Sequence, residues 1–160
     1  MAINKEHAIM ALEQAAKIAE QDGKPIINRF GGEYQFLSNF YEAPILYNGI
    51  TYRNAEAAYQ AQKCTDRAQE FANLSAKEAK RLGRKVSLRA DWDSVRIGIM
   101  HNIVRTKFSQ HEDLRDKLLA TYNKELIEGN YWNDCFWGVC MNEGENNLGK
   151  ILMLVREELM

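Results

Sequence analysis

Apolar and polar residues follow one another along most of this chain with the three-to-four-residue spacing of amphipathic helices. Beyond the first 25 residues, this spacing predicts helices at residues 55–64, 75–83, 91–110, 113–122 and 148–159. In the longest of them, Val95, Ile99 and Ile103 are expected to form the buried side. Asn54 and Ser75 stand just before two of the helices, where their side chains can accept hydrogen bonds from free backbone N–H groups.

Short β-rich segments lie between these helices. The strongest signal is Asn48-Gly49 between the two arms of residues 44–53, a pair typical of a tight β-hairpin. Further short strands are expected at residues 26–30, 125–129 and 134–140. Since helices outweigh strands, the pattern predicts an α+β fold, a mainly helical single domain of residues 25–160 around a small β-sheet.

Residues 1–24 are expected to form a helical extension at the N-terminus of that domain. The predicted helix of residues 5–21 has Ile9, Leu12 and Ala16 on one side, and Asp22-Gly23 ends it. Charged residues occur throughout this segment, so it lacks the apolar run of a signal peptide. Nowhere does the chain reach the ~18 apolar residues of a membrane span, and no membrane partner is expected.

Composition narrows the function classes only a little. The 160 residues carry a formal net charge of -1, which gives no overall attraction to nucleic acid or to a membrane surface. Cys64, Cys135 and Cys140 are odd in number and form no Cys-x-x-Cys pair, so a reduced, cytoplasmic setting is expected. Cys135 and Cys140 have no histidine at ligand spacing, and we expect no metal site.

Glu56, Tyr59, Gln60 and Lys63 fall on one face of the helix predicted at residues 55–64. One interpretation is ordinary: the glutamate complements the helix dipole, Tyr59 is half buried, and Gln60 and Lys63 are solvated. The other is catalytic. A carboxylate can protonate a leaving group or activate water, and a lysine two turns later can bind phosphate or attack a sugar aldehyde.

Aromatic and polar residues adjoin one another at two further places. Ser38 and Asn39 lie between Phe36 and Phe40, which are expected to anchor them in the core. The polar pair could face a ligand or form a simple turn. Trp92, at the start of the longest helix, could stack on a base or fill the core, and Asp91 before it is a candidate cap.

Near the C-terminus, residues 133–138 contain Asp134, Trp137 and Gly138. Asp134 is a candidate partner carboxylate for Glu56, or a clamp for ribose hydroxyls. The following stretch GENNLGK, residues 144–150, fits G-x-x-x-x-G-K, but Ile151 replaces the Ser or Thr of a nucleotide-binding P-loop. Two interpretations stay open: free N–H groups at this turn hold an anion such as phosphate, or Asn147 simply caps the next helix.

Basic residues crowd the segment from 77 to 89. A solvated surface is the ordinary interpretation, and a contact with phosphate or nucleic acid is the alternative. The residues are Lys77, Lys80, Arg81, Arg84, Lys85 and Arg89.

Taken together, the motifs resemble one known family. In order, they are F-x-S-N-F, Y-x-x-A-E-x-x-Y-Q-x-x-K, W-x-x-x-R, N-D-x-x-W-G and G-x-N-x-L-G-x-x-L-M-x-V-R. Their order and spacing over residues 28–158 resemble the NADAR family (NAD- and ADP-ribose-associated proteins), especially its bacterial N-glycosidases of riboflavin-pathway intermediates. The resemblance implies a hydrolase that cleaves the C1–N bond of a small phosphorylated ribosyl compound, without metal or cofactor.

The resemblance also implies roles for individual residues. Glu56 would act as acid or base, if burial keeps it protonated, and Lys63 as a Schiff-base nucleophile or a phosphate ligand. Asp134 is the third catalytic candidate. The expected substrate-binding residues are Ser38, Asn39, Tyr59, Gln60, Trp92, Trp137, Gly138 and Asn146.

Two alternative functions stay open at this stage. One is hydrolysis of ADP-ribosyl guanine on nucleic acid, for which the basic segment is the local support. The other is a non-catalytic module that binds ADP-ribose or NAD with the same residues. The oligomeric state is left open by the sequence.

Overall fold

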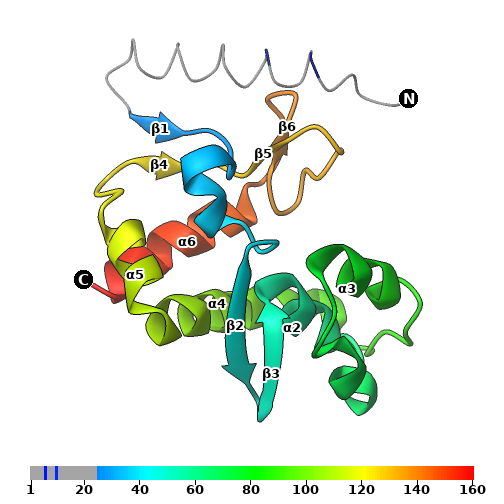
Figure 1. Ribbon diagram of the computed structural model, residues 1–160. Helices are drawn as coiled ribbons and strands as arrows, with labels where there is room; N and C mark the ends of the chain where they lie inside the picture. The colour runs from blue at the N-terminus through cyan, green and yellow to red at the C-terminus, as the bar shows by residue number, and fades with distance from the viewer. Residues whose placement is uncertain (1–5, 7–9, 11–24) are drawn as a thin grey trace. The chain divides into compact units, whose positions relative to one another are not determined.

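The computed structural model of the protein describes residues 6, 10 and 25–160 (Figure 1). The predicted helix of residues 5–21, and with it the N-terminal extension, therefore lies outside the described residues apart from Glu6 and Met10. The chain forms two compact units, one of residues 39–117 and one that combines residues up to Ser38 with Leu118–Met160. Helices predominate over short strands in the described residues, which confirms the predicted α+β class.

The unit of residues 39–117 begins with the predicted hairpin. Strands β2 (Glu42–Tyr47) and β3 (Ile50–Asn54) pair antiparallel, and Asn48 and Gly49 between them have φ angles of 49° and 83°. Both angles belong to the tight turn that Asn-Gly favours. The register shifts between Glu42 and Ile45, around Pro44, which has no N–H to donate to a regular ladder.

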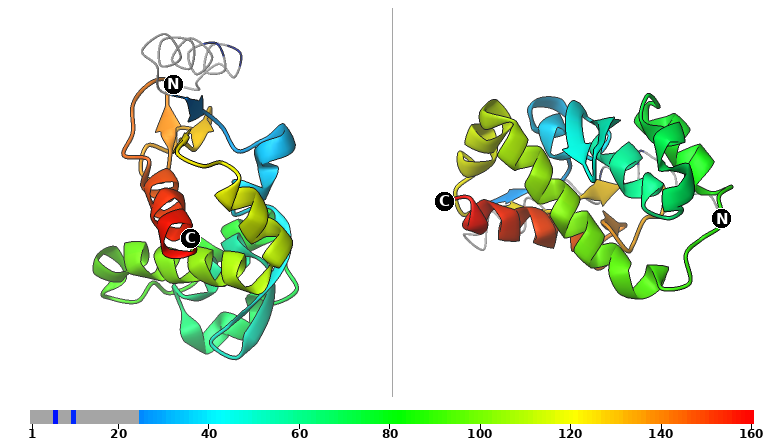
Figure 2. Two further views of the ribbon diagram at one scale, coloured as in Figure 1. Left: turned by 90° about the vertical axis from the view of Figure 1, so that its left-hand side faces the viewer. Right: turned by 90° about the horizontal axis from the view of Figure 1, so that it is seen from below.

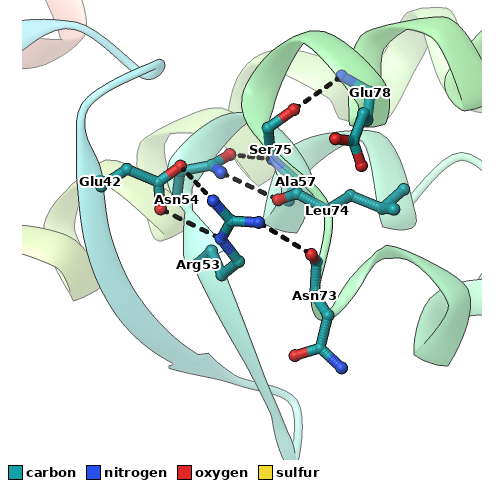
Figure 3. A network of polar contacts seen from close by, with 8 residues as sticks. All are labelled: Glu42, Arg53, Asn54, Ala57, Asn73, Leu74, Ser75 and Glu78. Atoms are coloured by element: carbon teal, nitrogen blue, oxygen red, sulfur yellow. Dashed lines mark hydrogen bonds and ion pairs between the residues drawn. The ribbon is translucent and has the colours of Figure 1, made fainter.

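Helix α2 (Ala55–Ala61) follows β3 without a loop. The Asn54 side chain accepts from the Ala57 N–H at 2.8 Å and so caps the helix, as predicted. The same side chain donates to the Leu74 carbonyl at 3.2 Å (Figure 3). Next to it, the Arg53 guanidinium bridges the Glu42 carboxylate at 3.3 Å and the Asn73 carbonyl at 3.0 Å.

These contacts fix the start of the next helix against the start of α2. The 3-10 helix η2 (Thr65–Phe71) leads into this segment, and α3 (Ala76–Gly83) follows it. The Ser75 hydroxyl accepts from the Glu78 N–H at 3.2 Å, so the second predicted cap is confirmed. Helices α2 and α3 pack against each other.

The longest predicted helix is confirmed as α4 (Trp92–Gln110), which packs on β2 and α2 (Figures 1 and 2). Of its expected buried side, Ile103 is buried, whereas Val95 and Ile99 are only partly so. The buried side chains are Trp92, Met100, Ile103, Val104, Lys107 and Phe108. Asp91 does not cap this helix, because its carboxylate pairs with Arg89 instead at 2.6 and 3.0 Å.

The end of α4 is held along the outer edge of β2. The Gln110 side-chain amide donates to the Leu46 carbonyl at 2.8 Å and accepts from the Leu46 N–H at 2.9 Å. His111 Nε2 then donates to the Pro44 carbonyl at 2.6 Å. A side-chain amide thus takes the place of a further strand on this exposed edge. Helix α5 (Glu112–Leu119) follows directly.

In the other unit, the strands are shorter than predicted. Strand β1 (Ile26–Ile27) pairs parallel with β4 (Glu125–Leu126), and β5 (Gly129–Asn130) pairs parallel with β6 (Val139–Cys140). Together with the hairpin, the strands of the described residues make three separate two-stranded sheets rather than one. The expected strand at 134–140 is shorter because residues 134–137 form a turn around the Asp134 side chain.

Two helical elements complete this unit, η1 (Gly32–Leu37) and α6 (Asn147–Glu158). Helix α6 packs on β4 and buries its predicted apolar side. Near its end, the Arg156 guanidinium donates to the Thr121 hydroxyl and to the Lys124 carbonyl, both at 2.9 Å. Across residues 6, 10 and 25–160, no helix has the length and apolar character that a membrane crossing requires.

Candidate active site

Glu56 lies in the first turn of α2 and is buried, with 8% of its surface exposed. Its backbone N–H donates to the Asn39 carbonyl at 3.0 Å, which ties the helix start to the segment before the hairpin. Its carboxylate Oε1 accepts from the Gln60 side-chain amide at 2.8 Å. The interpretation in which Gln60 is solvated is therefore wrong, because this side chain is buried against Glu56.

Gln60 is held in this position by a close approach of α3. A Cβ atom placed on Gly83 would overlap the Oε1 and Cδ atoms of Gln60, so a larger residue at position 83 would displace this side chain. Gln60 Oε1 is buried and has no hydrogen-bond partner within the described part of the chain.

Tyr59, Trp92 and Lys63 form a second cluster beside this pair. The rings of Tyr59 and Trp92 lie 5.1 Å apart between centroids and are tilted by 49°. Lys63 follows the end of α2, and its backbone N–H donates to the Gln60 carbonyl at 3.2 Å, which continues the helical turn. Its Nζ atom lies 5.8 Å from the Trp92 ring centroid, within reach of a cation–π contact.

The environment of Lys63 makes its amine easier to deprotonate. Burial lowers the pKa of Lys63 below that of a free lysine, and the positive charges of Arg84 and Lys80 lower it further. The Glu56 carboxylate acts in the opposite direction and raises this pKa. Glu56 and Lys63 therefore interact electrostatically, and an amine that is partly neutral can act as a nucleophile.

Asn39 belongs to the same unit and is buried. Its side-chain amide donates to the Met100 sulfur on α4 at 3.3 Å. Its neighbour Phe40 was expected in the core but is 46% exposed, while Phe36 is buried as expected. The Lys80 Nζ atom lies 5.9 Å from the centroid of the Phe40 ring.

Asp134 lies in the other unit, where it organises its own loop. Its Oδ1 atom accepts from the N–H groups of Phe136 at 3.1 Å and Trp137 at 2.9 Å. The Asn130 side chain accepts from the Asp134 N–H at 3.0 Å and donates to the Asp134 carbonyl at 2.8 Å. These bonds fix one carboxylate oxygen of Asp134 within the loop.

Asn146 also has a role within its own unit. It adopts a left-handed conformation, with φ of 53°, just before α6. Its side chain accepts from the Glu128 N–H and donates to the Leu126 carbonyl, both at 2.9 Å. Gly138 is buried nearby, and a Cβ atom there would overlap the Glu128 carbonyl.

The first N–H groups of α6 are already used. Those of Asn146, Asn147 and Leu148 donate to the carbonyls of residues 138, 136 and 137 at 3.3, 3.2 and 2.9 Å. The interpretation in which these three N–H groups are free for an anion is therefore wrong. Asn147 does not cap the helix either, because its side chain donates to the Phe136 carbonyl at 2.9 Å.

The structure thus brings one set of predicted residues together in each unit. The unit of residues 39–117 contains Asn39, Glu56, Tyr59, Gln60, Lys63 and Trp92. The other unit contains Ser38, Asp134, Trp137, Gly138 and Asn146. Ser38 stands at the end of η1, where its N–H donates to the Gln35 carbonyl at 3.0 Å.

The sequence did not lead us to predict that Lys107 is buried or that Asn130 is bonded to the Asp134 loop. Lys107 on α4 is 1% exposed, and burial lowers its pKa to about 7. A signal for it was present, since the four-residue steps through Ile99 and Ile103 continue to position 107. Asn130 gives no comparable signal, because asparagine is common in any turn.

The part of the chain described here contains no group of three or more His, Cys, Asp or Glu side chains placed to hold a metal ion. Its cysteines, Cys64, Cys135 and Cys140, are free.

Comparison with known proteins identifies the family. Residues 27–160 match the NADAR domain. The chain belongs to the NADAR domain family. This NADAR chain is 44% identical over 130 residues to a riboflavin biosynthesis protein of Vibrio vulnificus (strain YJ016), a match that covers 78% of the chain. The matched part is only 35% of that larger protein.

Smaller relatives match over most of their length. The NADAR chain is 41% identical over 133 residues to N-glycosidase YbiA of Shigella flexneri serotype 5b, covering 79% of this chain and 82% of the relative. The NMR structure of E. coli YbiA superimposes with a TM-score of 0.76 at 37% identity and covers 85% of both chains. The α+β fold is therefore shared with YbiA.

Proposed function

We propose that this NADAR chain is an N-glycosidase that hydrolyses the C1–N bond of a phosphorylated ribosyl compound. The substrate is a riboflavin-pathway ribosylaminopyrimidine phosphate or a close analogue. The observation that carries the proposal is buried Glu56, hydrogen-bonded to Gln60, on the same helical segment as Lys63, whose pKa burial lowers. Relatives named as an N-glycosidase and as a riboflavin biosynthesis protein support it.

Glu56 serves as the acid and then as the base. The C1–N bond breaks with its electron pair leaving on nitrogen, and C1 becomes oxocarbenium-like. A protonated Glu56 gives its proton to the departing nitrogen. The resulting carboxylate then takes a proton from the water that attacks C1, which yields ribose phosphate and free base. The hydrogen bond from Gln60 keeps the carboxylate in one orientation through both steps.

Lys63 offers a covalent route to the same products. Its neutral amine forms a bond to C1 as the base departs with the electron pair. Loss of a proton from the amine and opening of the ribose ring then give an imine. Water hydrolyses the imine, releasing the sugar aldehyde and the free amine. The lowered pKa of Lys63 favours the neutral amine that this route needs.

Further predicted residues of the unit of residues 39–117 bind the substrate. Trp92 stacks on the leaving base, and Tyr59 supports Trp92 through its ring contact. Asn39 adds a polar contact.

A turnover screen tests the proposal. Purified protein is incubated with a ribosylaminopyrimidine phosphate, ADP-ribosyl guanosine or NAD, and release of base is followed by mass spectrometry. We expect hydrolysis of the first, reduced by roughly 10²- to 10⁴-fold in Glu56→Gln, the range of a general acid–base group. Glu78→Gln, on the exposed side of α3, is the matched control. A Glu56→Gln protein that works at the wild-type rate would overturn the assignment.

Two further measurements test the covalent route through Lys63 and the alternative of a non-catalytic binding module. Borohydride should trap a sugar adduct on the wild type but not on Lys63→Ala; if no adduct forms on either protein, Lys63 binds rather than attacks. Calorimetry with ADP-ribose addresses the alternative of a binding module. Tight binding of ADP-ribose without hydrolysis of any compound in the screen would replace the enzyme assignment.

A further inference from the structure

Lys80 lies on α3 and Arg84 caps its end, and both border the face of α3 that Ala76, Ala79 and Gly83 bury. Gly83, which packs directly on the Gln60 side chain, marks that face. Arg84 keeps helical backbone angles at the end of α3, so residues three and four apart remain neighbours there. Lys80 and Arg84 therefore flank the site where α3 meets the Gln60–Glu56 pair.

A second contact places the Lys80 amine against the segment that precedes the hairpin. Its Nζ atom lies 5.9 Å from the Phe40 ring centroid. Phe40 directly follows Asn39, whose carbonyl accepts from the Glu56 N–H at 3.0 Å. The aromatic ring thus holds the amine beside the segment that binds the first turn of α2.

Lys80 and Arg84 differ from other basic residues of this unit in their pairing. Within the described residues neither forms a salt bridge, whereas Arg53, Arg67 and Arg89 each pair with a carboxylate. Both cations instead act on Lys63, where Glu56 is the opposing acid. Several cations gathered around one carboxylate attract an anionic group.

We propose that Lys80 and Arg84 form the subsite that binds the phosphate of the substrate. The inference rests on the proposed function, because it assumes that the sugar reacts beside Glu56 and Lys63. The Arg84 guanidinium can bind two phosphate oxygens at once, and Lys80 adds a mobile point charge. The chemistry recognised is a phosphate ester on ribose, which occurs both as a monoester and in the diphosphate of ADP-ribose.

The test compares two substrates. One is a ribosylaminopyrimidine with a phosphate ester on its ribose, and the other is the same compound without that phosphate. The variants are Lys80→Gln and Arg84→Gln, and the controls are Lys77→Gln and Arg81→Gln on the same helix. In each subsite variant, we expect the preference in kcat/KM for the phosphorylated substrate to fall roughly 10- to 100-fold, mainly through KM. Arg84→Lys should restore part of that preference, and thermal unfolding of every variant checks that it is folded.

Binding without turnover separates this inference from the function. Ribose 5-phosphate and ADP-ribose are titrated into wild type and variants by calorimetry, and stronger loss for one of them shows whether the monoester or the diphosphate is the ligand. Suppose that the wild type hydrolyses no riboside but binds ribose 5-phosphate, and that both variants bind it more weakly. The proposed function then fails and the subsite stands. An unchanged substrate preference in both variants, or equal losses in the controls, overturns the subsite.

Discussion

The Gln60 side-chain amide donates a hydrogen bond of 2.8 Å to the carboxylate of Glu56, one turn earlier on α2. Both side chains are buried, so this bond, rather than water, orients the carboxylate. Gly83 in turn holds Gln60 in place from α3. The orientation of the proposed acid therefore depends on the glycine at position 83, on another helix.

Gln60→Met tests this hydrogen bond. Methionine keeps an unbranched side chain of similar length but cannot donate to Glu56. Bonds to charged groups contribute about 1.5–3 kcal/mol, so kcat should fall roughly 10- to 100-fold. Gln62→Met is the control, because Gln62 is also buried but donates to the Ala58 carbonyl. Equal losses of activity in the two variants would contradict a specific role for Gln60.

Gly83→Ala tests the helix contact behind it. The added methyl group would overlap the Gln60 side chain, so we expect a loss of stability of about 1–3 kcal/mol together with lower kcat. Gly98→Ala is the control within α4, where an added Cβ meets nothing within 4 Å. Alanine should there stabilise the helix by about 0.5–1 kcal/mol. Chemical denaturation measures both changes, and a neutral Gly83→Ala would contradict the close approach.

The pKa of Lys63 should respond to its neighbours in opposite directions. Glu56→Gln removes an attractive charge from the ammonium and should lower this pKa further. Lys80→Gln removes a repulsive charge and should raise it. Competitive acylation of Lys63 across a pH series, read by peptide mass spectrometry, measures each shift. A Lys63 that titrates like a free lysine, near pH 10.4, would exclude the proposed activation.

Local signals explain what the sequence predicted well. Asn48-Gly49 defined the hairpin, and Asn54 and Ser75 defined two helix starts, because each acts on backbone within three residues. Contacts between distant segments were not predictable in this way. Asp91 turned to Arg89 rather than to its helix, and carbonyls of residues 136–138 took the N–H groups expected to hold an anion.

The candidate site shows the same division. The helical spacing of Glu56, Tyr59, Gln60 and Lys63 was visible in the sequence, and the structure adds burial and the Glu56–Gln60 bond. The position of Gly83 against Gln60 depends on how α3 packs, which the spacing of residues along one helix does not contain.

Lys107 should make stability depend on pH. Its pKa is about 7 in the folded protein and near 10.5 when unfolded, so the unfolded chain binds more protons between these values. The free energy of unfolding should therefore rise with pH across that window. Lys107→Met lacks the titrating amine, and its Tm relative to wild type should decrease from pH 7 to pH 10. Lys150→Met, at an exposed position, is the control. A Tm difference that is constant with pH would contradict the burial of an uncharged amine.

Asp134 is the third catalytic candidate from the sequence and makes a loop contact in the structure, and two substitutions separate its charge from that contact. Asp134→Ala removes the oxygen that accepts from Phe136 and Trp137, so both stability and activity should fall. Asp134→Asn keeps an acceptor oxygen at that place but loses the negative charge.

We therefore expect Asp134→Asn to unfold within a few degrees of wild type while kcat/KM drops roughly tenfold or more, the effect of losing one charged hydrogen bond to substrate. Thermal unfolding and steady-state kinetics on the same preparations measure the two effects. Full activity in Asp134→Asn would exclude a role for the negative charge of Asp134. The function of this side chain would then be its loop contact alone, because asparagine keeps the acceptor oxygen.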